Sequence, residues 1–210
     1  MISQILAIVG VILVAITSVF LIVSVDWRMS VAVLAVQYVG VFALVAVGWP
    51  ISLALVKLVA GWMSGAILGM ALSGMPPQTA KNMVGEESQL SNRGWLHFRS
   101  GRLFRLFTIG MIGLLVLNVS PSITSLLPML KLEQAIGASF LLGMGMLQLS
   151  LTAQPLRVIL GLLTVLSGFE VVYSGVETST LVTGLLAGVN LGVALVGAYL
   201  FVNQLGEPAP

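Results

Sequence analysis

Long apolar runs alternate with short polar breaks along the whole chain. Seven runs are each about 17–25 residues long, the length at which a helix crosses the hydrocarbon core of a bilayer. They cover residues 2–25, 31–47, 51–72, 103–119, 136–152, 156–175 and 181–202. Proline, glycine and charged residues separate the runs, as is typical of turns. The pattern therefore predicts an all-α fold, a polytopic membrane bundle of about seven transmembrane helices.

Composition supports this assignment and excludes several kinds of chemistry. The 210 residues are 58% hydrophobic and 8% charged, whereas soluble domains are roughly 45–50% apolar and 25% charged. The chain has no cysteine and a single histidine, His97. Disulfides, iron–sulfur ligation and paired-histidine metal or haem sites are thereby excluded. With no nucleophile–base set or phosphate-binding loop either, we expect no cofactor, no metal and no catalysis by the chain alone.

Basic residues set the expected orientation. Segment 73–102 contains Lys81, Arg93, Arg99 and Arg102, which are much of the positive charge in the chain. The positive-inside rule makes this segment cytoplasmic. Counting spans outward then predicts a multi-pass protein of the inner (plasma) membrane, with its N-terminus outside and its C-terminus in the cytoplasm. The segment also has the character of an amphipathic surface element that contacts headgroups or a protein partner. Nucleic acid is not expected as a partner.

Two apolar stretches repeat each other. Residues 57–72 and 180–195 are identical at eight of sixteen aligned positions, which favours an internal duplication. The chain would then consist of a first three-helix unit (1–72), a cytoplasmic loop (73–102), a linking helix with an outer loop (103–135) and a second three-helix unit (136–210). Both units would run in the same direction, as parallel repeats. Each stretch carries glycines four residues apart, which we interpret as surfaces for close helix packing. These glycines are Gly61, Gly65 and Gly69, and Gly184, Gly188 and Gly192.

Two ionisable residues, Lys57 and Glu170, lie well inside predicted spans. Each costs about 2.5–3.5 kcal/mol to insert near a helix centre, so a compensating role is expected. Both lie roughly 6–7 Å from their helix midpoints toward the outer side, at 1.5 Å per residue. They are therefore candidates for a proton or ion relay, while a buried structural pair and a snorkelling lysine stay as alternatives. Secondary polar candidates are Asn190, Gln37 and Gln148, which more often bond between helices.

The residues around these two charges resemble a known family. Leu-Val-Lys57-Leu-Val, together with Phe140-Leu-Leu-Gly and the stretch that ends Gly168-Phe-Glu170, resembles hydrogenase-4 component E. That family is a membrane subunit of group 4 hydrogenase complexes. Its second half is similar to the three-helix subunit K of respiratory complex I and to the corresponding small membrane protein of multisubunit cation/proton antiporters. The resemblance implies that Lys57 and Glu170 match the intramembrane lysine and glutamate of the family.

The resemblance also carries a departure and a functional expectation. Complex I subunit K has a second intramembrane glutamate, whose place falls near Gly188–Asn190, where this chain has no acid. The implied function is a non-catalytic membrane subunit of an energy-converting complex, either a group 4 hydrogenase or a relative of NADH-quinone oxidoreductase. It would contribute to proton or ion translocation and to assembly beside antiporter-like membrane subunits. The alternatives are a small independent membrane transporter and a purely structural membrane protein.

Overall fold

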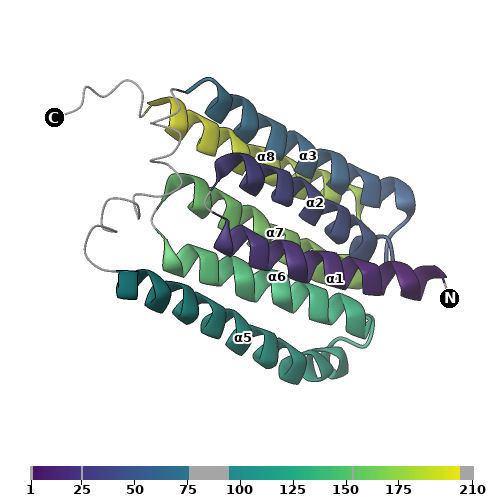
Figure 1. The fold of residues 1–210 in the computed structure, drawn as a ribbon. Helices are drawn as coiled ribbons and strands as arrows, with labels where there is room; N and C mark the ends of the chain where they lie inside the picture. Colours follow the sequence, from purple (N-terminus) through teal and green to yellow (C-terminus); the bar gives the residue numbers. More distant parts are fainter. Residues whose placement is uncertain (1, 25, 76–94, 153, 204–210) are drawn as a thin grey trace.

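The computed structural model describes residues 2–24, 26–75, 95–152 and 154–203. Within these ranges it contains seven helices and no strand (Figure 1). Each helix includes a segment long and apolar enough to cross a membrane. The prediction of a seven-helix membrane bundle is therefore confirmed. The helices are α1 (Ile2–Val23), α2 (Trp27–Val45), α3 (Ile51–Ser73), α5 (Trp95–Leu126), α6 (Leu132–Leu151), α7 (Pro155–Val176) and α8 (Thr180–Asn203).

The boundaries of α5 differ from the expected span. The helix begins at Trp95, eight residues before the expected start, so the last part of the predicted loop is helical. It also continues past Pro121, which was expected to end it. A proline removes one backbone hydrogen bond from a helix, and near a helix end that loss is tolerated. The rest of the predicted cytoplasmic loop, residues 76–94, lies outside the described residues.

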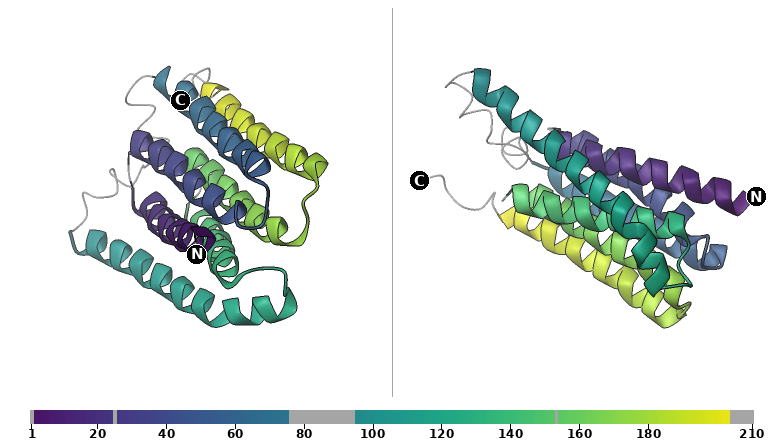
Figure 2. Two further views of the ribbon diagram at one scale, coloured as in Figure 1. Left: turned by 90° about the vertical axis from the view of Figure 1, so that its right-hand side faces the viewer. Right: turned by 90° about the horizontal axis from the view of Figure 1, so that it is seen from below.

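The helices form two layers. One layer contains α1, α2 and α3 in that order, and the other contains α6, α7 and α8. The layers pack face to face, with α1 on α6, α2 on α7 and α3 on α8, while α5 lies at the edge against α6 (Figure 2). Successive helices run in opposite directions, so that α1 begins and α8 ends at opposite ends of the bundle (Figure 1). Each layer holds the helices of one predicted three-helix unit, while the duplication itself stays a prediction.

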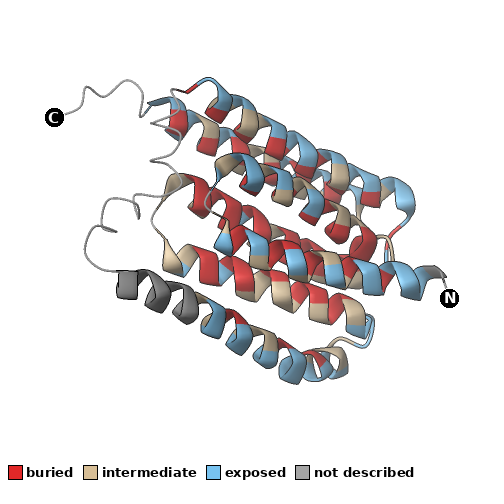
Figure 3. Cartoon of the chain, viewed as in Figure 1, coloured by how far each residue is buried: buried red, intermediate tan, exposed pale blue. Residues whose placement is uncertain are grey.

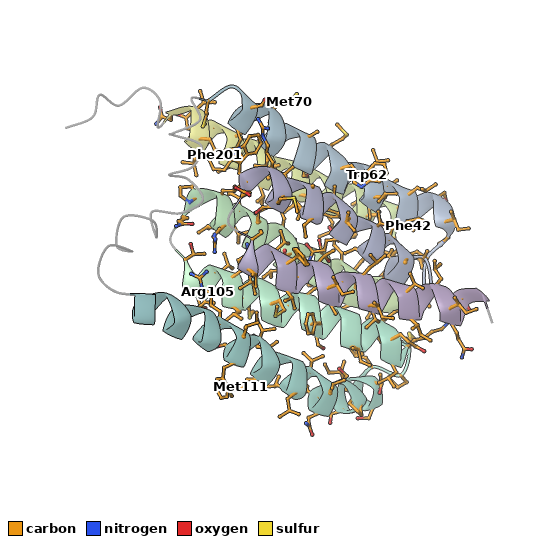
Figure 4. The ribbon with its side chains drawn as sticks, in the orientation of Figure 1. Phe42, Trp62, Met70, Arg105, Met111 and Phe201 are labelled. Carbon is orange, nitrogen blue, oxygen red and sulfur yellow. The ribbon has the colours of Figure 1, made fainter. Side chains whose placement is uncertain are left out.

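Burial separates a central helix from peripheral ones. In α7, 61% of the apolar window is buried inside the protein, against 17% in α5. Buried residues lie on the inward sides of the helices and exposed residues on the outer sides (Figure 3). The outer surface is apolar, and the exposed side chains of Trp62, Met70 and Met111 lie on it (Figure 4). Such a surface fits contact with lipid, because hydrocarbon is the surrounding solvent.

The two glycine stripes differ in their packing. A methyl group built on Gly61 of α3 would overlap the ring of Tyr38 on α2, so close approach there requires glycine. On α8, a methyl group at Gly184, Gly188 or Gly192 would meet no atom of the described chain within 4 Å. The expectation of tight helix packing therefore holds at Gly61 and is wrong for the α8 stripe within this chain. The α8 helix contacts α3 and α7 through its other faces.

Candidate functional site

An ion pair lies in the centre of the bundle. The Lys57 Nζ atom of α3 donates a hydrogen bond to the Glu170 Oε1 atom of α7 at 2.5 Å. The two side chains are 0% and 1% exposed. The structure thus brings together the two ionisable residues that the sequence singled out. Lysine snorkelling to the outer interface, one of the alternatives, is wrong, because the ammonium group points into the bundle and not out of it.

A third helix contributes to the same carboxylate. The Asn190 Nδ2 atom of α8 donates to Glu170 Oε1 at 2.8 Å, and its side chain is 0% exposed. One carboxylate oxygen therefore accepts two hydrogen bonds, from residues on two different helices. These bonds stabilise the negative charge of Glu170. They also tie α3, α7 and α8 together at one depth, which gives Asn190, a secondary candidate, a place in the site.

Several polar atoms around this carboxylate have no hydrogen-bond partner among the described residues. They include Glu170 Oε2, Asn190 Oδ1 and the hydroxyl of Tyr38 on α2. The Tyr38 side chain is 1% exposed, and its hydroxyl lies near the Ser167 hydroxyl and within electrostatic range of Glu170. Buried polar atoms without partners are rare in native structures. The site is therefore a polar chamber with unused hydrogen-bonding capacity.

A second polar cluster joins α1, α2 and α7. The Gln37 Nε2 atom donates to Ser18 Oγ at 3.1 Å, and the Thr164 hydroxyl lies 3.5 Å from Gln37 Oε1. All three side chains are buried. Thr164 precedes Glu170 by six residues, about 9 Å along the helix. Gln37, another secondary candidate, therefore belongs to a layer next to the ion pair, with no hydrogen bond to it within the described chain.

The remaining secondary candidate is elsewhere. Gln148 lies on α6, is 3% exposed, and makes no hydrogen bond to Lys57, Glu170 or Asn190 in the part of the chain that the structure describes.

Some polar neighbours escaped the sequence analysis, although a local signal for them exists. On α7 the buried polar residues recur every three or four positions, which places them on one helix face. They are Thr164, Ser167, Glu170 and Ser174. Their spacing indicates that the carboxylate belongs to a polar stripe. The partners of that stripe on α1 and α2 carry no comparable signal.

Metal chemistry and known relatives add no further assignment. Within the described ranges, no group of three or more His, Cys, Asp or Glu side chains is placed to hold a metal ion. No family model matches the chain, and comparisons with curated proteins and with solved structures return no significant match. The fold and the composition show an integral, multi-pass helical membrane protein that lies in a lipid bilayer. The resemblance to hydrogenase-4 component E stays a prediction.

Proposed function

We propose that this chain is a non-catalytic membrane subunit of an energy-converting complex, and that Lys57, Glu170 and Asn190 form a proton-transfer site within it. The observation that carries the proposal is the fully buried ion pair. Taking two charges out of water costs several kcal/mol per ion, and well-packed apolar residues often stabilise a fold as well or better. Ionisable residues inside a membrane bundle mark proton and ion pathways more often than they serve as braces.

The geometry suits proton exchange. Transfer of one proton along the bond from Lys57 Nζ to Glu170 Oε1 converts the ion pair into a neutral amine and a neutral carboxylic acid. The net charge of the buried site stays at zero in both forms, so neither form leaves an isolated charge in a medium of low dielectric. Asn190 donates to the same oxygen and favours the carboxylate form. A proton entering or leaving the site therefore meets a group that accepts it and a neighbour that compensates it.

Two features favour a subunit over an independent transporter. The described helices α3, α7 and α8 run without a break past the site, whereas transporters often bind substrate at interrupted helices. A groove of about 370 Å³ between α3 and α8 has an almost wholly apolar lining, which includes Leu55, Val59 and Leu191. That lining offers no passage to a hydrated solute. The resemblance to hydrogenase-4 component E supports antiporter-like membrane subunits as partners, in either a hydrogenase or a quinone reductase.

Affinity purification from the native membrane tests the assembly. The chain is tagged, solubilised in mild detergent, and every polypeptide recovered in stoichiometric amount is identified. We expect antiporter-like membrane subunits together with an iron–sulfur or nickel–iron arm. Recovery of the chain alone, or as a homo-oligomer, contradicts the complex and favours a small independent transporter.

Substitution of the carboxylate tests the proton-transfer role. In the reconstituted complex, Glu170→Gln keeps the shape of the side chain and its capacity to accept hydrogen bonds but cannot exchange a proton. We expect coupled proton movement to be lost while the complex still assembles. The matched control is Glu133→Gln, a partly exposed glutamate in the first turn of α6. Unchanged proton movement in Glu170→Gln contradicts the relay and leaves a purely structural ion pair.

A further inference from the structure

Three buried polar atoms around Glu170 share one property. Tyr38 Oη, Glu170 Oε2 and Asn190 Oδ1 each have no hydrogen-bond partner among the described residues. Their side chains are 1%, 1% and 0% exposed, so bulk water does not reach them. Leaving a buried donor or acceptor unpaired costs about 1–3 kcal/mol. Three such costs in one place indicate that the site holds a further group.

The three atoms converge on one carboxylate. Asn190 already contacts Glu170 through the nitrogen of its amide, which holds its oxygen within a few ångströms of the same carboxylate. The ring of Tyr38 is fixed against Gly61 of α3, where no larger side chain fits. Its hydroxyl lies within electrostatic range of Glu170. These residues come from α2, α7 and α8, so the group that they share must sit where the three helices meet.

We propose that Tyr38, Glu170 and Asn190 bind an internal water molecule that bridges α2, α7 and α8. Such a water donates one hydrogen to Glu170 Oε2, donates the other to Asn190 Oδ1, and accepts the hydroxyl hydrogen of Tyr38. This arrangement makes three hydrogen bonds, about the number that buried waters typically make. All three atoms are satisfied at once, each in its ordinary role as donor or acceptor.

The local charge favours water over a metal cation. The ammonium group of Lys57 already lies against Oε1 of the same carboxylate and compensates its charge. A sodium or potassium ion at Oε2 would be close to that ammonium, and like charges repel strongly in a medium of low dielectric. Water carries no charge and meets no such repulsion.

The water gives Tyr38 a role in the proton-transfer site, and this step rests on the proposed function. Through the water, Glu170 becomes linked to the Tyr38 hydroxyl, which lies near Ser167 on α7. Ser167 is one turn from Glu170, on the side of the cluster formed by Thr164, Gln37 and Ser18. Tyr38 is thus a positioning residue that holds the water against Glu170 and extends the hydrogen-bonded chain toward the start of α7.

Tyr38→Phe tests the site, because it removes one hydroxyl and keeps the ring against Gly61. The full-length protein is studied in the assembly in which it purifies, by high-resolution electron cryomicroscopy and by infrared spectroscopy in H₂¹⁶O and H₂¹⁸O. The wild type should show density at about 2.7–3.0 Å from all three atoms and an isotope-sensitive water band. Both signals should be lost in Tyr38→Phe. The matched control, Tyr199→Phe, removes a hydroxyl from an exposed side chain of α8 and should retain them.

Each other outcome overturns the proposal. Direct contact of the three atoms with another polypeptide of the assembly excludes the water, and so does density retained in Tyr38→Phe. Density that depends on the choice between sodium and potassium indicates a metal ion. The role in proton transfer has its own readout, a fall of about tenfold in the rate for Tyr38→Phe, equivalent to about 1.4 kcal/mol. Water present with normal proton movement in Glu170→Gln contradicts the proposed function and leaves the water site standing.

Discussion

Removing either charge of the central ion pair should destabilise the protein far more than removing both. Lys57→Met leaves the Glu170 carboxylate buried with Asn190 as its remaining donor in the described chain. At a separation of 2.5 Å, two unit charges attract by about 7 kcal/mol at an effective dielectric constant of about 20. Much of that attraction offsets the cost of burying them. We therefore expect each single variant, Lys57→Met or Glu170→Gln, to lose about 3–5 kcal/mol of unfolding free energy.

The double variant decides whether this contact is real. With Lys57→Met and Glu170→Gln combined, no charge is left unpaired at the site, and an uncharged pair often replaces an ion pair at little cost. We expect its unfolding free energy to lie within about 1 kcal/mol of the wild type. The coupling energy of the cycle should then be at least about 4 kcal/mol, larger than the usual range for residues in contact.

The assay is reversible unfolding of the full-length protein in mixed micelles, followed by tryptophan fluorescence. Trp49 and Trp62 lie in the described part of the bundle and report on its packing. Lys131→Met is the control, because that lysine is exposed at the start of α6 and should change stability by less than about 0.5 kcal/mol. Additive effects of the two single substitutions, within about 0.5 kcal/mol, would refute the direct contact.

Three further predictions follow from the packing and the topology. Gly61→Ala should lower the detergent melting temperature, at about 1–3 kcal/mol, because its methyl group overlaps an aromatic ring, whereas Gly188→Ala should be neutral or raise stability by up to about 1 kcal/mol; equal melting temperatures for the two variants would contradict this difference. Thr164→Val keeps the side-chain volume but removes the hydroxyl next to the buried glutamine of α2, and should cost about 1–2 kcal/mol in the same unfolding assay; a fully stable variant would show that this contact contributes nothing. Because the chain has no native cysteine, Met129→Cys should react with an impermeant thiol reagent only from outside the cell and Arg28→Cys only from the cytoplasm; labelling of both from one side would contradict the span count.

The membrane class and the seven helices were predictable because their signals are local. A run of apolar residues long enough to cross a bilayer is visible in the sequence without any knowledge of its neighbours. Lys57 and Glu170 stood out for the same reason, since a charge within such a run is costly wherever the helix packs. Local signals were weaker at boundaries, where Pro121 was expected to end a helix that continues to Leu126.

The meeting of Lys57, Glu170 and Asn190 depended on the tertiary structure. Lys57 and Glu170 are separated by 113 residues along the chain, and their expected depths followed from the rise per residue. Depth does not determine which helices are neighbours or which face each helix turns inward. The packing of two layers settles both, and it also buries Tyr38 beside the carboxylate while leaving the α8 glycines without a neighbour in the described chain. The sequence by itself thus determined which segments enter the membrane and which charges need compensation, because hydrophobic length and insertion cost belong to single segments. Only the tertiary structure decided which groups provide that compensation, because contacts between helices arise from the packing of the whole bundle.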